Sequence, residues 1–107
     1  MPKKTPKKKN KGQRTVAQIN REFIEEYAMN IEEDLMTVDD FDEAIVGVVR
    51  RCASTPIVAY DYQKMVEILV RDKGLTPEDA MDHLEYNVVN AYVGELTPCF
   101  IDRPIEL

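Results

Sequence analysis

A chain of 107 residues, 44% of them apolar and 32% charged, has the composition of a soluble globular domain and is too short for two such domains. Its longest apolar run, residues 44–49, is far shorter than the roughly 20 residues that a membrane-spanning helix needs, so we expect no membrane contact. The net charge of −6 conceals two opposite regions: residues 1–14 hold seven of the fourteen Lys and Arg and no acid, whereas the rest holds seven basic residues and twenty acids.

The basic segment, residues 1–14, contains two prolines, one glycine and no large apolar side chain after Met1. It can bury too little apolar surface to offset the entropy lost on ordering, so we predict a disordered basic tail. Lysine and arginine in such a tail neutralise phosphates without reading bases, which predicts salt-sensitive nucleic-acid binding. The alternative is a solubilising extension, or one that folds back on the protein's own acidic surface. The candidate nucleic-acid contacts are Lys3, Lys4, Lys7, Lys8, Lys9, Lys11 and Arg14.

The first predicted element is a long amphipathic helix over residues 15–35. Thr15 and Gln18 have the spacing of a capping box, and apolar residues then recur at steps of three and four. The apolar stripe consists of Val16, Ile19, Phe23, Tyr27, Ile31 and Leu35. Because acids occupy the other faces, we expect this stripe to pack on its own domain or on a second copy rather than on anionic lipid. A homodimer through this helix is therefore one assembly that the sequence allows.

Seven acids lie within residues 32–43. The run Asp39-Asp40-Phe41-Asp42-Glu43 lacks the central glycine and the twelfth-position glutamate of an EF-hand, which disfavours a calcium loop. We therefore expect a solvated turn that caps the next element, and no metal. The functional alternative is that Asp39, Asp40 and Asp42 form a docking patch for a protein.

Two short runs rich in valine and isoleucine, residues 44–49 and 56–60, predict neighbouring strands joined by a polar connection. A helix over residues 43–51, capped by Asp42, competes with the first strand, because short apolar runs fit either structure. Asp61 then caps a helix over residues 62–72, which Gly74 terminates.

The clearest local signal is a further helix start at Thr76, which is followed by Pro77 and two acids. That helix is expected to run to Gly94, and residues 96–101 then predict a last strand at the sheet edge. The fold class is therefore α+β: a long N-terminal amphipathic helix, then two strands, two helices and a strand, with a small sheet covered by helices on one face. Residues 15–107 are predicted to form this single domain.

Six segments within residues 42–101 resemble small uncharacterised proteins of phages and bacteria. They are residues 42–48, 50–52, 60–62, 74–80, 84–88 and 91–98. The most specific are Glu-Tyr-Asn at residues 85–87 and Tyr-Val-Gly-Glu-Leu-Thr-Pro at residues 92–98. The resemblance implies a phage or prokaryotic origin and carries no activity. The basic tail and the first helix lie outside it.

The chain carries few groups that can do chemistry. His83 is the only histidine and stands four residues from Asp79 and from Asn87, which predicts a hydrogen-bonded surface role. Cys52 and Cys99 lie outside any CxxC pair, so we expect reduced thiols and a cytoplasmic location, in a bacterial host if the protein is phage-encoded. No phosphate-binding loop, nucleophile elbow or HExxH motif is present. The sequence therefore predicts a protein that is not an enzyme and needs no cofactor.

Polar and aromatic residues gather where the last helix is expected to end. Glu85, Asn87, Tyr92 and Glu95 form a pocket or contact surface there, or else satisfy loop amides and close the core. The candidate protein-binding residues are then Asp39, Asp40, Asp42, Glu85, Asn87, Tyr92 and Glu95.

The function expected from these observations is that of a small accessory protein that binds macromolecules. Its tail contacts nucleic acid and its acidic domain contacts a protein. One alternative is an acidic domain that imitates nucleic acid and so inhibits a host protein. The last alternative is an enzyme that uses Cys52 or residues 85–95.

Overall fold

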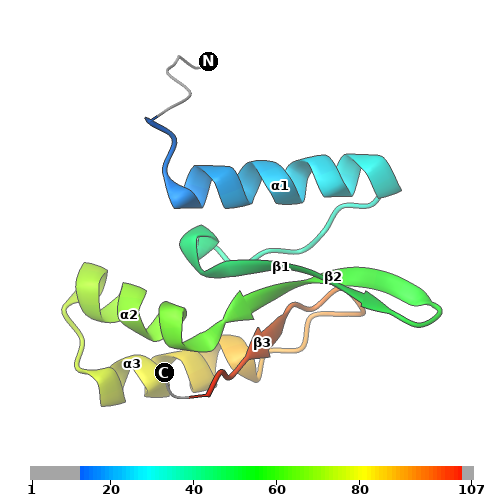
Figure 1. The fold of residues 1–107 in the computed structure, drawn as a ribbon. Coiled ribbons are helices and arrows are strands. Elements are labelled where there is room, and N and C mark those ends of the chain that lie inside the picture. Colours follow the sequence, from blue (N-terminus) through cyan, green and yellow to red (C-terminus); the bar gives the residue numbers. More distant parts are fainter. Residues whose placement is uncertain (1–12, 105–107) are drawn as a thin grey trace.

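The computed structural model describes residues 13–104 and shows a mixed α+β fold with three helices and a three-stranded sheet, the class that the sequence predicts (Figure 1). The regular elements are α1 Val16–Ile31, β1 Ile45–Arg51, β2 Ser54–Asp61, α2 Tyr62–Lys73, α3 Pro77–Leu84 and β3 Cys99–Ile101. A 3-10 turn, Asp42–Ala44, precedes β1, and a π-helical turn, Glu85–Val89, extends α3. None of the helices in this part of the chain is long and apolar enough to cross a membrane.

Each helix begins at a side-chain cap. At α1 the Thr15 hydroxyl accepts a hydrogen bond from the Gln18 amide (3.1 Å), and the Gln18 side chain accepts one from the Thr15 amide (2.8 Å), which completes a capping box. Asp61 and Thr76 cap α2 and α3 by accepting from the amide three residues further on. These local bonds set the start of each helix without help from distant residues.

Helix α1 ends at Ile31, earlier than residue 35, where the apolar stripe predicts its end. Glu32 adopts the left-handed conformation (φ 58°), and the Glu33 amide donates to the Ala28 carbonyl (3.1 Å), which closes the helix in a Schellman-type ending. The apolar period continues to Leu35, but three consecutive acids oppose further helix at its negative end. Residues 32–41 instead return as irregular chain to the start of the hairpin.

Strand β2 is the centre of the sheet. It pairs antiparallel with β1, with Val48 opposite Val58, and parallel with β3, with Tyr60 opposite Phe100. The segment for which helix and strand compete in the sequence is thus a 3-10 turn followed by a strand. The last strand is shorter than expected, because residues 99–101 pair with β2 while residues 96–98 are irregular.

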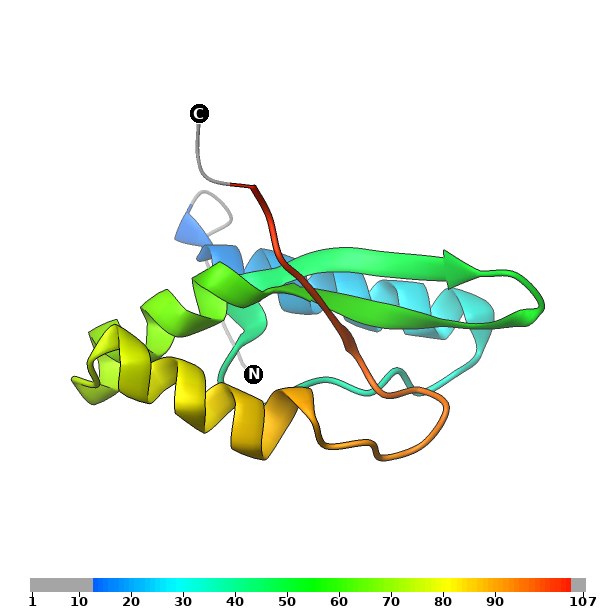
Figure 2. The ribbon, with the colours of Figure 1, turned by 90° about the horizontal axis from the view of Figure 1, so that it is seen from below.

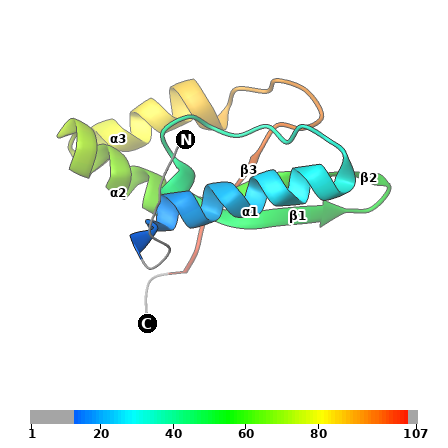
Figure 3. The same ribbon diagram turned by 90° about the horizontal axis from the view of Figure 1, so that it is seen from above.

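The helices take different positions around the sheet. Helix α1 lies along one face of the hairpin β1–β2, whereas α2 and α3 lie beyond the end of the hairpin where β2 passes into α2 (Figures 1 and 3). Seen from below, the strands lie in front of α1, and β3 is nearest the viewer (Figure 2). The core contains Val58, Tyr60, Met65 and Leu84, which are fully buried. The Tyr60 hydroxyl also accepts a hydrogen bond from the Val38 amide (2.7 Å), which holds the irregular segment against the sheet.

The first half of the apolar stripe of the first helix is exposed, whereas Tyr27, Ile31 and Leu35 are half-buried. Val16, Ile19 and Phe23 are 58%, 46% and 48% exposed, whereas Ile24 is buried. The Asn20 side chain sets the rotation of the helix, because its amide donates to three backbone carbonyls at the start of β1 (3.0, 3.2 and 3.4 Å). Val16, Ile19 and Phe23 therefore do not pack on their own domain, and the other expectation from the sequence, packing on a second copy, stays a prediction. Asn20, a polar residue outside the apolar stripe, therefore fixes which side of α1 faces the core.

Candidate functional site

An open groove lies between the C-terminal half of α1, residues 32–37 and the irregular segment that precedes β3. Its volume is about 820 Å³. Four acids line it, namely Glu25, Glu32, Glu33 and Asp34. Its apolar lining consists of Ile24, Ala28, Met29, Leu35 and Leu96, and Arg21 and Thr37 complete it. We call this feature the acidic groove. It combines carboxylates with apolar surface, as a site for a basic side chain with an aliphatic stem requires.

Three acids of the groove lie at the C-terminal end of α1, where negative charge is unfavourable. Glu32 is a non-glycine residue in the left-handed conformation, which costs about 1 kcal/mol relative to an ordinary backbone geometry. Glu32, Glu33 and Asp34 also follow the negative end of the α1 dipole, and the last turn of that helix contains no basic residue to offset them. Sequences usually break several local rules together at functional sites. This point of the chain therefore merits a functional explanation.

The groove carboxylates have no cation of their own among the described residues. None of the four forms an ion pair within residues 13–104. Arg21 lines the groove, but its guanidinium donates two hydrogen bonds to the Asp42 carboxylate (2.9 and 3.0 Å), and this contact raises the pKa of Arg21. The positive charge nearest the groove is therefore already neutralised, and the groove keeps its negative charge.

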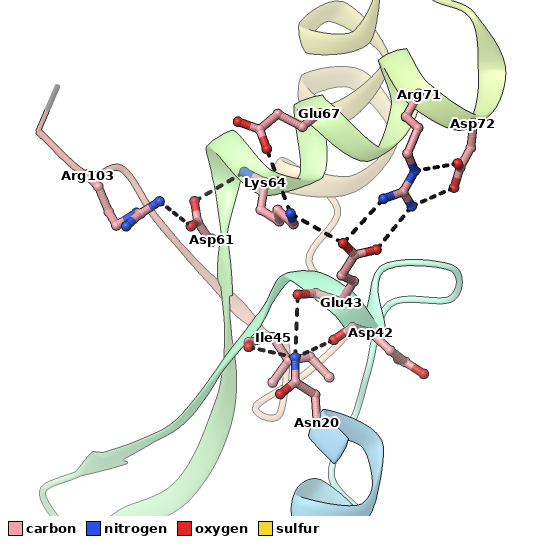
Figure 4. Close-up of polar contacts among 10 residues, drawn as sticks. All are labelled: Asn20, Asp42, Glu43, Ile45, Asp61, Lys64, Glu67, Arg71, Asp72 and Arg103. Carbon is pink, nitrogen blue, oxygen red and sulfur yellow. Dashed lines mark hydrogen bonds and ion pairs between the residues drawn. The ribbon is translucent and has the colours of Figure 1, made fainter. Parts of the chain in front are cut away.

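Two acids outside the groove, Glu43 and Asp61, serve the fold. Figure 4 shows Glu43 between Lys64 and Arg71 of α2, with nitrogen–oxygen distances of 3.3 and 3.1 Å. These hydrogen bonds, that from Arg71 first, lower the pKa of Glu43. Asp61 likewise binds Arg103 (2.8 Å). These carboxylates hold the start of β1 and the end of β2 to other parts of the chain.

The first group of predicted protein contacts is divided between these two roles. Asp39 and Asp40 are exposed in a turn, and Asp40 has a positive φ of 75°. Asp42 is held in its ion pair with Arg21, so it is a structural residue as well as a candidate contact. None of the three lines the acidic groove.

The second group of predicted contacts is spread along the π-helical turn and the segment that follows it. Glu85, Asn87, Tyr92 and Glu95 are all exposed. The Asn87 side chain donates to the backbone carbonyl of His83 (3.1 Å), four residues back on the same helix. The backbone carbonyl of Glu95 accepts from Arg51 (3.1 Å).

One member of this second group acts on a neighbouring element. Desolvation by partial burial, together with the Glu85 carboxylate, raises the pKa of Tyr62 to about 12. Tyr62 is the first residue of α2, and Glu85 is the first residue of the π-helical turn that extends α3.

The predicted nucleic-acid contacts fall almost entirely outside the described part of the chain. Lys3, Lys4, Lys7, Lys8, Lys9 and Lys11 belong to residues 1–12, which the structure does not describe. Arg14 is exposed and pairs with Glu22 of α1. The side chain of Arg14 therefore reaches along the helix to Glu22.

The groups with chemical potential stay apart. Cys52 is exposed in the turn between β1 and β2, whereas Cys99 is half-buried, and desolvation raises the pKa of its thiol. His83 is exposed, and its Nδ1 lies 3.4 Å from the Asn87 amide nitrogen. In residues 13–104 no three His, Cys, Asp or Glu side chains gather closely enough to hold a metal ion.

The acidic groove was not found from the sequence. Glu32, Glu33 and Asp34 belong to the acidic run seen there, but Glu25 and Leu96 join them only through the fold. The available signal was local: three consecutive acids after a helix whose last turn has no basic residue and no terminating glycine. No protein-family model matches the chain, and no curated protein or solved structure is significantly similar to it.

Proposed function

We propose that this protein is a small non-enzymatic binding protein whose acidic groove holds a basic segment of a protein partner and whose lysine-rich arm, residues 1–14, contacts nucleic acid. The observation that supports the groove is its set of carboxylates, which form no ion pair within residues 13–104 and lie beside apolar side chains. The arm is supported by its charge, seven basic residues and no acid. The resemblance of residues 42–101 supports a phage or prokaryotic origin and, with it, action in the cytoplasm of a bacterium.

The chemistry of the groove selects for lysine or arginine on an extended or helical segment. The aliphatic stem of such a side chain packs on Ile24, Leu35 and Leu96, while its charged end reaches the carboxylates. Each exposed ion pair contributes only about 0.2–1 kcal/mol, so binding requires several pairs and weakens with salt.

Neutralising the groove acids tests this proposal. We expect the triple variant Glu32→Gln, Glu33→Gln, Asp34→Asn to bind a short fluorescein-labelled peptide of lysines and leucines about fivefold more weakly, since two or three surface ion pairs are lost. Fluorescence anisotropy measures this affinity. The matched control, Glu78→Gln, Asp82→Asn, Asp102→Asn, removes the same charge away from the groove. Equal affinities of the two variants would show that the peptide responds to net charge and not to the groove.

A nucleic-acid mimic is the second candidate. Glu25, Glu32, Glu33 and Asp34 present several negative charges along one side of the domain, as a phosphate backbone does. If the groove imitates nucleic acid, duplex DNA competes with it for the partner and releases the partner. A partner that binds the groove through a specific peptide segment is not released by duplex DNA.

The exposed stripe of α1 supports a homodimer of this binding protein. Val16, Ile19 and Phe23 form an apolar ridge on a side of α1 that the domain leaves uncovered. Sedimentation of wild type and Phe23→Ser at equal concentration tests this assembly, and identical monomeric behaviour of both would refute it.

A further inference from the structure

We infer that the lysine-rich arm of this same chain occupies the acidic groove when no partner is bound, so that arm and groove restrain each other's binding. This inference rests on the proposed function for the chemistry of the groove and names the occupant of its resting state. The occupying segment is residues 3–11, which contain six lysines and no acid.

The charges of arm and groove are complementary within one chain. The groove presents four carboxylates that form no ion pair within residues 13–104, and Arg21 beside them is paired with Asp42. Three other basic groups of the domain are used elsewhere: Lys64 and Arg71 bind Glu43, and Arg103 binds Asp61. Arg50 and Lys73 form no ion pair within residues 13–104, but they are single charges, whereas the arm concentrates six lysines in nine residues.

The arm is long enough to reach the groove. Helix α1 rises about 1.5 Å per residue, so Glu25 lies about 15 Å and Glu32 about 25 Å along the helix from Thr15. Nine residues of extended chain span up to about 30 Å. An arm that doubles back along α1 from Gln13 can therefore cover the groove from Glu25 to Asp34.

One contact in the described part of the chain shows this direction. Arg14, just before the helix cap, pairs with Glu22, eight residues further along α1. Glu22 lies one helical step of three from Glu25, so the two carboxylates are neighbours on the helix surface. Arg14, the last basic residue of the arm, thus already contacts the side of α1 that leads to the groove.

The intramolecular arrangement makes weak pairs sufficient. Because arm and groove belong to one chain, each meets the other at an effective concentration in the millimolar range. Contacts of millimolar intrinsic affinity then keep the groove occupied for a large part of the time. By reciprocity, whatever binds the groove raises the affinity of the arm for nucleic acid by the same factor as nucleic acid raises access to the groove.

The contact is tested directly by amide NMR spectra of the full chain. We expect the variant with all six lysines of residues 3–11 changed to Gln to shift the amides of residues 25–35 relative to wild type, and to leave those of α3 unchanged. Raising the salt concentration should bring the wild-type spectrum toward that of the variant. Identical amide positions at residues 25–35 in both proteins overturn the inference, whether or not the groove binds any added peptide.

Affinity for a labelled 20-nucleotide single-stranded DNA supplies the second readout. At low salt we expect Glu32→Gln, Glu33→Gln, Asp34→Asn to bind this probe about threefold more tightly than the control Glu78→Gln, Asp82→Asn, Asp102→Asn, since only the first variant releases the arm. Equal affinities of the two variants overturn the inference, because the gain is then a general loss of repulsion. A groove that fails to bind the lysine–leucine peptide, together with the expected NMR shifts, refutes the protein-partner proposal and leaves the arm contact standing.

Discussion

The ends of helices α1 and α2 have the same backbone geometry and opposite chemistry. Helix α2 ends at Gly74 in the left-handed conformation (φ 69°), with Arg71 and Lys73 in its last turn. Helix α1 ends at Ile31 and is capped by Glu32 in the same conformation (φ 58°); two further acids follow, and its last turn has no basic residue. The first ending satisfies the rules of helix termination, and the second breaks two of them.

The difference indicates that the end of α2 serves stability, whereas the end of α1 serves binding. At the end of α2, Arg71 binds both Asp72 (2.7 Å) and Glu43 (3.1 Å), so its charge serves the fold. At the end of α1 the carboxylates line the groove and form no ion pair within residues 13–104. Natural proteins accept such local costs where binding requires them.

The largest expected effect on stability comes from replacing Gly74, the glycine that terminates α2. Gly74→Ala should lower the free energy of unfolding by about 1.5 kcal/mol, because alanine resists the left-handed conformation. No atom lies within 4 Å of the added methyl group, so the loss is one of backbone conformation alone. Urea denaturation measures it. Gly74→Asn should lose less, since asparagine tolerates this conformation; equal losses for both variants would point to a different cause.

A glycine at the end of α1 should instead stabilise the protein, by a somewhat smaller free energy. Glu32→Gly should raise the free energy of unfolding by about 1 kcal/mol and weaken binding of the lysine–leucine peptide at the same time. Glu32→Gln keeps the strained backbone and should recover only a few tenths of a kcal/mol from the helix dipole. A Glu32→Gly variant that gains stability and keeps full peptide affinity would contradict the assignment of this acid to binding.

The smallest effect is a change in the acid response of the α2 network. The pKa of Glu43 is lowered in the folded state by Arg71 and Lys64, so this carboxylate contributes stability above its unfolded pKa of about 4.3. That contribution is lost as the pH falls through the lower, folded pKa. Glu43→Gln should therefore be less stable than wild type at pH 7 and show a flatter fall below pH 4.5 in thermal unfolding. Parallel profiles would show that Glu43 does not carry this response.

Local signals in the sequence predicted the elements, and non-local contacts decided their orientation. The caps at Thr15, Asp61 and Thr76 are present because each depends on an amide three residues away. The rotation of α1 depends on Asn20 and carbonyls more than twenty residues distant, and the apolar period could not reveal it. The α+β class was therefore within reach of the sequence, whereas the outward position of Phe23 was not.

Contacts between distant parts of the chain also decide which residues form the candidate site. The sequence predicts that Asp42 contacts a protein because it lies in an acidic run. Only the fold shows that Arg21 already binds this carboxylate. The groove was missed because Leu96 reaches α1 from a distant part of the chain. Charge counts can thus locate an acidic region, but partners in space decide which of its carboxylates are available.

The parallel pairing of β3 with β2 constrains how the chain can be made. Ala59 pairs with Cys99, so the second neighbour of the central strand lies forty residues further along the chain than the residue with which it pairs. During synthesis the hairpin and α2 can form while one edge of β2 still exposes unpaired amides and carbonyls, a surface prone to association with other strands. The ribosome must therefore release residues 99–101 before this domain can close, and translation pauses ahead of that point would prolong the exposed intermediate.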